Sequence, residues 1–221
     1  MSLTGSYYEK YWEDPHSAPP SSGPTTAERK ALLKRALREI PAGSAVLDAG
    51  CGVGEFTQFI HELGFRATGI DLSERAIAFA KRSYPERDFR IGVPEDFSAE
   101  FADRFGAIWS SEVIEHVFDV YGFLRALHHS LAPQGRLLLT TPYHGLLKNV
   151  LINLGNHHVH YKPFGGHIRF FNKRSLGYCL NYCGFTVRTW SAFGRMWPLY
   201  KSFFVVAERT HDPNPPPPAD S

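Results

Sequence analysis

The sequence predicts an α/β protein built around a doubly wound parallel sheet. From residue 44 onward, short apolar runs alternate with amphipathic helical patterns, which is typical of repeated β-α-β units. A glycine-rich turn follows the first apolar run, and an acidic residue ends the second. Both features lie where such sheets bind ligands, at the carboxyl ends of their strands.

The first forty residues form a separate N-terminal segment in this prediction. An aromatic opening, SYYEKYWEDP, leads into a Pro/Ser/Gly stretch at residues 15–24. A helical pattern covers residues 25–40 and stops at Pro41, whose ring cannot continue a helix. We expect residues 1–40 to form a lid or helical layer that is flexibly linked to a main domain at residues 41–210.

Three strands and two helices follow in order. AVLDAG is the first strand, and apolar residues then recur at helical spacing from Phe56 until Gly64, which suits a helix C-cap. RATGID is the second strand, and Ser73 can cap the helix after it. DFRIG is the third strand. This succession of strand, turn and helix is what a parallel sheet requires.

The second half of the chain continues this pattern and then departs from it. GAIWS is the fourth strand, FLRALHHSL a helix ended by the turn APQG, and RLLLTTP the fifth strand. Residues 143–171 form an aromatic, histidine-rich insert that does not alternate. A helix from Asn172 and the runs TVRTW and SFFVVAE complete the domain. The proline-rich tail, residues 211–221, is expected to be disordered.

Composition limits the classes of function. The chain carries 24 basic and 22 acidic side chains, so its net charge of +2 gives no strong footprint for nucleic acid or a membrane. Three cysteines, at Cys51, Cys179 and Cys183, do not make a paired disulfide framework and are expected to be reduced core residues. Neither a signal peptide nor a membrane-spanning run is visible. We expect a cytoplasmic protein.

The glycine-rich turn LDAGCGVGEF indicates which cofactor the sheet binds. Asp71 ends the next strand, 21 residues after Gly50, which is close to the spacing at which an acid meets a ribose diol. Asp48 and Glu55 flank the turn, and two carboxylates would repel the pyrophosphate of NAD. S-adenosylmethionine has no phosphate and carries two cationic groups. The charges therefore favour S-adenosylmethionine.

Five motifs in succession make the chain resemble a known family. VLDAGCGVGEF, GIDLSERAI, AIWSSEVIEHV, LAPQGRLLLTTPY and HIRFFNKRSLGYCLNYCGF are similar to motifs of the class I S-adenosylmethionine-dependent methyltransferases over about residues 44–187. Within this family the chain resembles the group around the ubiquinone-biosynthesis O-methyltransferases. The resemblance implies a Rossmann-like, seven-stranded, mostly parallel sheet whose last strand is antiparallel.

The same resemblance implies the residues that hold the cofactor. Asp48, Gly50 and Gly52 would contact its methionine end, and Asp71 its ribose hydroxyls. Ser111 falls where such enzymes line the cofactor after the fourth strand.

Two parts of the expected cofactor site are less regular. The adenine contact departs from the family pattern, and the cover over the cofactor would come from the N-terminus. The acid that usually meets the adenine is replaced by Val93, which leaves Glu95 or Asp96 for that contact, or both as an exposed acidic turn. In similar enzymes an N-terminal aromatic segment closes over the cofactor. Here that segment would comprise Tyr7, Tyr8, Tyr11 and Trp12, which could instead form a packed cluster.

Two histidines are candidates for a general base. Methyl transfer is an in-line displacement that depends mostly on positioning, but a protonated oxygen nucleophile gains from a base. His116 follows the fourth strand and His144 the fifth, so both lie at the edge where the cofactor binds. Each could equally be a hydrogen-bonded structural histidine.

A metal site is an alternative for the stretch SSEVIEHV. Glu112, Glu115 and His116 would share one face of a helix. They resemble the Glu-x-x-Glu-His element that some family members associate with a divalent ion, and their ligand types suit Mg²⁺, Mn²⁺ or Zn²⁺. His167 is placed in sequence as the fourth ligand. The same elements also occur in relatives that use no metal.

The insert is expected to select the substrate. Its histidines, basic residues and aromatic residues suit an acidic or aromatic molecule. An apolar stripe in GLLKNVLINLG is expected to pack onto the domain, or alternatively to form an apolar entrance or a peripheral membrane contact.

The sequence as a whole predicts an S-adenosylmethionine-dependent methyltransferase that acts on an oxygen of a small aromatic or apolar molecule. An RNA 2′-O-methyltransferase with a Glu/Glu/His metal site is the second interpretation, although the near-neutral charge makes nucleic acid a poor partner. A non-catalytic, cofactor-binding partner protein is the third. The oligomeric state is left open.

Overall fold

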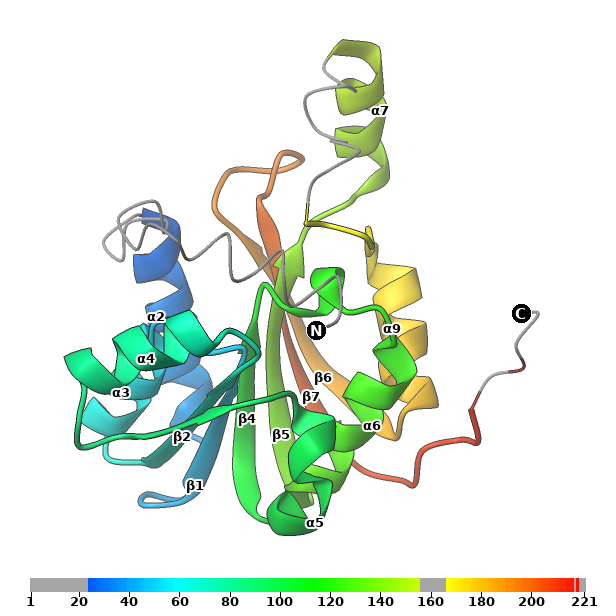
Figure 1. The fold of residues 1–221 in the computed structure, drawn as a ribbon. Coiled ribbons are helices and arrows are strands. Elements are labelled where there is room, and N and C mark those ends of the chain that lie inside the picture. The colour runs from blue at the N-terminus through cyan, green and yellow to red at the C-terminus, as the bar shows by residue number, and fades with distance from the viewer. Residues whose placement is uncertain (1–23, 156–165, 217, 219–221) are drawn as a thin grey trace.

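A computed structural model describes residues 24–155, 166–216 and 218, and its centre is one seven-stranded sheet (Figure 1). The strands lie in the order β3-β2-β1-β4-β5-β7-β6. Their bounds are β1 (Ala45–Ala49), β2 (Arg66–Asp71), β3 (Asp88–Ile91), β4 (Phe105–Ser111), β5 (Leu131–Pro142), β6 (Phe185–Phe193) and β7 (Ser202–Arg209).

The pairing of the strands confirms the predicted doubly wound architecture. β1 lies in parallel between β2 and β4, β3 extends the sheet beyond β2, and β5 continues it beyond β4 in parallel. β7 is antiparallel to both β5 and β6, as the family resemblance implies for the last strand. The order reverses between β1 and β4, which is the switch point where such sheets form a crevice.

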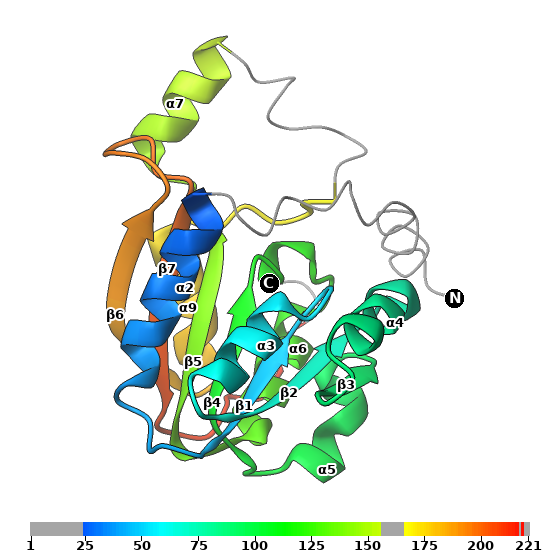
Figure 2. The same ribbon diagram turned by 90° about the vertical axis from the view of Figure 1, so that its left-hand side faces the viewer.

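Helices cover both faces of the sheet, and Figure 2 shows α2 and α3 in front of it with α6 and α9 behind. The helices are α2 (Pro24–Leu37), α3 (Glu55–Glu62), α4 (Glu74–Ser83), α5 (Ser98–Phe101), α6 (Val120–Ser130), α7 (Leu146–Gly155) and α9 (Lys173–Tyr182). Two 3₁₀ turns, η1 (Pro94–Phe97) and η2 (Ile114–His116), follow β3 and β4.

Alternating side chains divide the core between the two faces. Val46, Trp109 and Leu138 pack with α2 and α3 on one side. Their neighbours in sequence on the same strands pack with α6 and α9 on the other. Trp109 is fully buried, and its ring lies 5.3 Å from that of Phe56 on α3. Because Leu33 and Leu37 of α2 are also buried, the described N-terminal helix belongs to the same core.

Two boundaries differ from the sequence prediction. α2 ends at Leu37, and the backbone then turns with a bond from Glu39 N to Ala36 O, so the helix stops before Pro41. The stretch APQG, expected to be a turn before the fifth strand, lies inside β5. Leu131 already pairs with Phe105, and the extra residues form an irregularity in which Gln134 has φ 63°.

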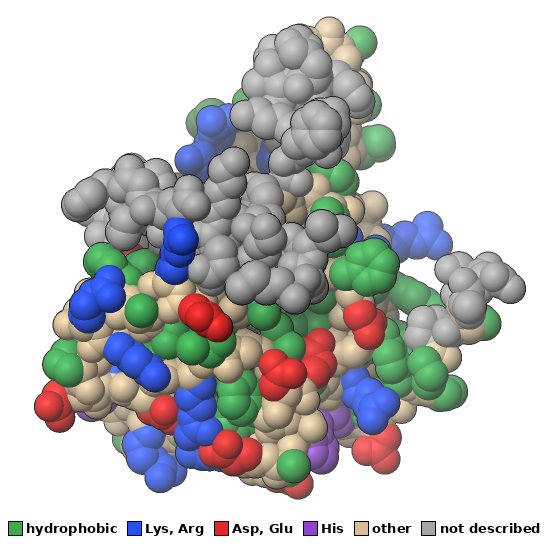
Figure 3. All heavy atoms as spheres, in the orientation of Figure 1, with side chains coloured by type: hydrophobic (Ala, Val, Ile, Leu, Met, Phe, Trp, Pro, Cys, Tyr) green, Lys and Arg blue, Asp and Glu red, His purple; other side chains and the backbone are tan. Residues whose placement is uncertain are grey.

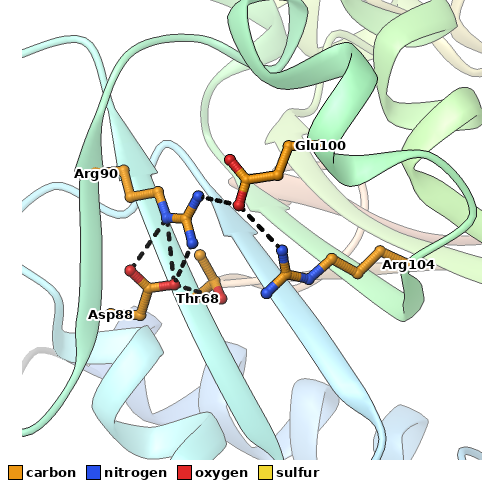
Figure 4. A network of polar contacts seen from close by, with 5 residues as sticks. All are labelled: Thr68, Asp88, Arg90, Glu100 and Arg104. Carbon is orange, nitrogen blue, oxygen red and sulfur yellow. Dashed lines mark hydrogen bonds and ion pairs between the residues drawn. The ribbon is translucent and has the colours of Figure 1, made fainter.

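A polar network joins the edge strand β3 to its neighbours (Figure 4). Asp88 accepts hydrogen bonds from Thr68 on β2 and from Arg90, and Arg90 also bonds Glu100 on α5 at 2.5 Å. These groups are partly exposed, so the network fixes the geometry of the edge more than it stabilises the fold.

The chain after β7 runs back across α6 and α9. Tyr121 donates a hydrogen bond to Asn214 O at 2.8 Å, and Tyr182 donates one to Pro215 O at 2.9 Å. His128, 4% exposed, has its Nε2 2.8 Å from His211 O and therefore donates through Nε2. These contacts differ from the disorder predicted for the tail; residues 217 and 219–221 lie outside the described part.

No helix in the described ranges combines the length and apolar character needed to cross a bilayer. Cys183 is a buried core residue, Cys179 packs against the same core, and all three cysteines are free thiols, as expected.

The buried His128 makes stability depend on pH. Burial lowers the pKa of His128 below its usual 6.5, so the neutral ring stabilises the fold above 6.5 and this contribution is lost as pH falls below it. His128→Gln should cost about 1 kcal/mol at about pH 8 and less at about pH 5. Denaturant unfolding at both pH values measures this difference. His129→Gln, at an exposed position on the same helix, is the control. An equal cost of His128→Gln at both pH values would contradict the prediction.

Candidate functional site

The turn between β1 and α3 is held tightly against strand β2 and against the loop that follows β4. Gly50 N and Cys51 N both donate to Ile70 O on β2 at 2.9 Å. Gly50 has φ 84°, and a Cβ on it would lie 2.3 Å from Cγ2 of Val113, in the loop after β4. Only glycine allows this approach, so the loops after β1 and β4 meet at one point.

Asp71 stands beside this turn at the carboxyl end of β2. Its Oδ2 accepts a hydrogen bond from Gly52 N at 2.8 Å, and its Oδ1 accepts one from Ser73 N at 2.9 Å. The backbone therefore fixes the orientation of the carboxylate. The structure brings together Gly50, Gly52 and Asp71, three of the residues predicted to hold the cofactor.

Asp48 lies beneath the turn and is 2% exposed. Its Oδ2 accepts a hydrogen bond from Thr57 on α3 at 2.7 Å. Burial, opposed by this hydrogen bond and assisted by the negative charge of Asp71, raises the pKa of Asp48 to about 7. A nearby cation would lower this pKa and favour the ionised carboxylate.

The two acids predicted near the adenine have different surroundings. Asp96 closes its own turn, because its Oδ2 accepts a hydrogen bond from Val93 N at 2.9 Å. Burial raises the pKa of Glu95. Of the two side chains, that of Asp96 closes the turn, whereas no hydrogen bond to another residue of the turn is described for that of Glu95.

Arg29 is a site residue that the sequence analysis did not single out. Its Nη1 donates to the Oγ of Ser111 at 3.0 Å, across 82 positions of sequence, and its guanidinium lies 5.3 Å from the centre of the Phe56 ring. Its Nε is buried and has no hydrogen-bond partner among the described residues. Ser111 also shares a hydrogen bond with Thr140. A cation thus reaches the edge of β4 from α2.

Glu112 turns away from the face on which it was predicted. It has φ 57° and precedes η2, so it does not stack with Glu115 and His116 as it would in an α-helix. Its Oε2 accepts a hydrogen bond from Ser202 on β7 at 3.3 Å. Burial raises the pKa of Glu112, while hydrogen bonding from Thr140 and the charge of Arg29 oppose the rise.

Glu115 is fully buried under the last residues of the insert. Its Oε2 accepts a hydrogen bond from Thr141 at 3.0 Å, and its backbone oxygen accepts bonds from the amides of Ile168 and Arg169. Burial, reinforced by the charge of Glu112, raises the pKa of Glu115 well above 4.5. Its Oε1 is buried without a hydrogen-bond partner in the described ranges.

His116 and His167 stand beside that oxygen. Nδ1 of His116 lies 2.7 Å from Gly166 O and so carries the proton, which leaves Nε2 basic, 3.9 Å from Oε1 of Glu115. Burial lowers the pKa of His116. One ligand atom from each of Glu115, His116 and His167 lies within 4.8 Å of the others. Three of the four predicted metal ligands are therefore brought together, and Glu112 is not in this group.

His144, the other candidate base, is 4% exposed and follows β5. Its ring packs edge-on against Phe170, with centroids 5.0 Å apart. The segment 166–171 thus touches both candidate histidines. The predicted lid residues Tyr7, Tyr8, Tyr11 and Trp12, and the insert histidines His157, His158 and His160, lie outside the described residues.

Comparison with known families and sequences identifies the chain. A model described as a methyltransferase domain matches residues 25–189. The ubiquinone biosynthesis O-methyltransferase of Chromobacterium violaceum is 31% identical over 160 residues, which is 69% of each chain. That of Xanthomonas axonopodis pv. citri is 38% identical over 105 residues, covering 46% of this chain and 44% of the relative. The match thus spans less than half the length of several curated relatives.

Solved structures share the fold at lower identity. A magnesium protoporphyrin IX methyltransferase from Synechocystis PCC 6803, crystallised with SAH, has a TM-score of 0.70 at 17% identity and covers 93% of this chain and 99% of its own. A 1,6-didemethyltoxoflavin-N1-methyltransferase from Burkholderia thailandensis has a TM-score of 0.71 at 19% identity, covering 93% and 87%. Together with the matched family model, these findings show that the chain belongs to the class I S-adenosylmethionine-dependent methyltransferases, in the group of the ubiquinone biosynthesis O-methyltransferases.

Proposed function

We propose that the protein transfers a methyl group from S-adenosylmethionine to an oxygen of a small aromatic or apolar molecule. The observation that carries this proposal is the pair of carboxylates of Asp48 and Asp71. They lie beside a turn that requires glycine at position 50. S-adenosylmethionine supplies a methyl group on a cationic sulfur, and its ammonium group adds a second positive charge. A site whose buried carboxyl has its pKa raised to about 7 suits such a cation.

The groups at the edge of the sheet match the separate parts of the cofactor. Asp71 has an oriented carboxylate for the ribose diol. Arg29 offers a guanidinium to the carboxylate of the methionine end, and its Nε is a buried donor without a partner among the described residues. Asp48 lies under the turn, where its negative charge stabilises the cationic end. The carboxylate and the cationic end of the cofactor thus each have an opposite charge on this chain.

The acceptor is proposed from the groups that surround His116. Phe118, Ile168 and Phe170 expose 82%, 51% and 43% of their surface close to the polar cluster. Exposed apolar side chains beside a few polar groups suit a small aromatic molecule that carries a hydroxyl group. The relatives named as O-methyltransferases support oxygen as the acceptor atom.

His116 is the better candidate for the general base. Its Nδ1 proton is held by Gly166 O, which leaves Nε2 as the basic nitrogen, and the lowered pKa keeps that nitrogen unprotonated near neutral pH. The carboxyl of Glu115 lies 3.9 Å from Nε2 and can stabilise the imidazolium that forms when a hydroxyl proton is taken up. His144, which packs against Phe170, stays the alternative base.

A divalent metal held by Glu115, His116 and His167 is a second proposal at the same place. The orphaned Oε1 of Glu115, the basic Nε2 of His116 and the His167 ring form a donor set that suits Mn²⁺ or Zn²⁺. When bound, the metal would lower the pKa of an acceptor hydroxyl. Glu112 is left out of this proposal because neither of its carboxylate oxygens belongs to this group of ligand atoms, and its Oε2 accepts the hydrogen bond from Ser202.

Loss of the ribose contact should weaken binding of the whole nucleoside. We expect Asp71→Asn to reduce affinity by at least about tenfold, both for S-adenosylhomocysteine and for methylthioadenosine, which lacks the amino-acid end. Calorimetric titration measures both constants. Asp103→Asn, on the exposed turn before β4, is the control. Binding of NAD but of neither sulfur compound would overturn the proposed function, and binding without turnover across an acceptor panel would favour a non-catalytic partner protein.

Loss of the guanidinium should discriminate between the same two ligands. Arg29→Met should weaken S-adenosylhomocysteine by about ten- to a hundredfold, since a charge-assisted hydrogen bond to the carboxylate is lost. Methylthioadenosine has no carboxylate, so its affinity should stay within about twofold. The same titration measures both. Equal losses for the two ligands would assign Arg29 to the fold of the site rather than to the cofactor.

The metal proposal predicts which carboxylate matters. Glu115→Gln and His167→Ala should each weaken Mn²⁺ binding by at least about tenfold, whereas the matched Glu112→Gln should leave it nearly unchanged. Titration followed by electron paramagnetic resonance of free Mn²⁺ measures this without an activity assay. A wild-type protein that binds no Mn²⁺, or an equal effect of Glu112→Gln, would reject the three-residue site.

A further inference from the structure

The chain after β7 is fixed to the core before it reaches its proline-rich tail. Thr210 N and His211 N donate to Gly184 O at 3.1 and 3.4 Å, and His211 O accepts a hydrogen bond from the buried His128. A Cβ on Gly184 would lie 2.4 Å from His211 O, so only glycine lets the chain approach so closely. These contacts, which we call the anchor, fix the position from which the tail leaves.

Three tyrosines lie on the outside of α6 and α9 beside the tail. Tyr178 and Tyr182 are one turn apart on α9, with ring centroids 5.7 Å apart, and the ring of Tyr121 on α6 lies 6.4 Å from that of Tyr182. Figure 3 shows hydrophobic side chains, the class that includes tyrosine and proline, gathered on the right-hand side, where Figure 1 shows the end of the chain. We call the side chains of Tyr121, Tyr178 and Tyr182 the tyrosine surface.

The hydrogen bonds between the tyrosine surface and the tail are of the kind that a proline-rich ligand requires. Proline has no N–H group, and a polyproline helix has no internal hydrogen bonds, so the carbonyl oxygens of such a segment are free to accept. The tyrosines supply the donors, because Tyr121 bonds Asn214 O at 2.8 Å and Tyr182 bonds Pro215 O at 2.9 Å. Two successive carbonyl groups are thereby bound beside aromatic rings, which is how proline-rich segments are commonly recognised.

Asn214 sets the register of the tail on this surface. It is the only residue other than proline at positions 213–218, so it carries the only backbone N–H group of that stretch. This N–H donates to Tyr182 O at 2.9 Å, and the Nδ2 of Asn214 donates to the same oxygen at 3.1 Å. Tyr182 ends α9, where a carbonyl oxygen has no partner within the helix. The asparagine therefore distinguishes Pro-Asn-Pro-Pro from an unbroken run of prolines.

The contacts of the tail are weaker than those of the anchor. The three side-chain hydrogen bonds that hold Asn214 and Pro215 are exposed, and both of these residues are exposed as well. Water competes for such bonds, so each of them adds little to stability, and the ends of a chain open at low cost. The anchor contains the buried His128. The tail can therefore leave the tyrosine surface while the anchor stays in place.

We propose that the tyrosine surface is a docking site for a proline-rich segment of a partner protein, with the pattern Pro-Asn-Pro-Pro, and that the chain's own tail occupies the site in the partner's absence. The seated tail shows that the surface accepts this chemistry. Because the tail is tethered, its effective concentration is about 1 mM, and a partner segment competes against that value. The docking is independent of the proposed methyl transfer, in which no residue of the tyrosine surface is given a part.

Freeing the surface in the full chain tests the docking. The triple variant Asn214→Gly/Pro215→Ser/Pro216→Ser removes the contacts of the tail but keeps the anchor. A fluorescent peptide with the sequence of residues 211–221 should bind this variant at least about tenfold more tightly than it binds the wild type, in which the tail competes. Fluorescence polarisation measures both constants, and thermal melting verifies folding. A triple variant that binds the peptide no better than the wild type would overturn the docking.

Matched changes in the triple variant locate the contact. Tyr121→Phe and Tyr182→Phe should each weaken peptide binding by about fivefold, since one hydrogen bond is lost while the ring stays. Tyr178→Phe is the control, because the donating hydroxyl groups belong to the other two tyrosines, and its effect should be less than about twofold. A peptide with proline in place of the asparagine should bind about tenfold more weakly. Equal effects of the three tyrosine changes, or full affinity of the all-proline peptide, would contradict the assigned contacts.

A second copy of the chain is the alternative occupant, because its tail offers the same segment. Sedimentation velocity of the wild type and of the triple variant decides between the two occupants. A wild-type dimer that the triple variant does not form would assign the surface to exchanged tails and overturn the proposal of a separate partner. A monomer in both cases, together with peptide binding to the triple variant, is the expected result.

Discussion

The contact between two loops at the switch point of the sheet is the constraint on which the site depends. The loop after β1 can approach the loop after β4 only because Gly50 has no side chain in the space that Val113 fills. This approach sets the turn that presents Gly52 to Asp71, and it sets the start of η2, from which Glu115 and His116 project. The glycine therefore couples the turn beside Asp71 to the polar cluster of Glu115 and His116 through van der Waals contact.

A second constraint is electrostatic. Three carboxyl groups near the strand ends, those of Asp48, Glu112 and Glu115, are gathered where burial makes ionisation costly. Arg29 is the cation that approaches them from α2, and its charge opposes the rise in pKa of both glutamates. A positively charged ligand would act in the same direction. The site is thus arranged so that binding a cation relieves an unfavourable charge distribution already present in the fold.

The sequence predicts those features that depend on local pattern. The β-α rhythm predicts the strands because it repeats along the chain. The acid that ends the second apolar run, Asp71, is predicted to lie beside the glycine turn because parallel strands end at one edge of the sheet. Glu112 was misplaced because helical spacing was assumed where a positive φ starts a 3₁₀ turn. Arg29 could not be found because its meeting with Ser111 depends on how α2 packs across the sheet. The exposure of Leu146 and Leu154 is likewise a tertiary property, since an apolar stripe looks the same whether or not the body of the protein covers it.

The antiparallel direction of β7 determines which connections of the chain lie at the edge of the sheet that holds the candidate site. β6 runs alongside β7 in the opposite direction, so the turn between them opens at the same edge as the chain leaving β5. The connection after β5 and the connection between β6 and β7 therefore lie at the same edge of the sheet, and neither forms part of the pairing between strands. Either connection can change in length or composition without breaking a pairing between strands. Residues in these two connections can therefore change to suit a new acceptor without altering Asp48 and Asp71, the residues proposed to contact the cofactor.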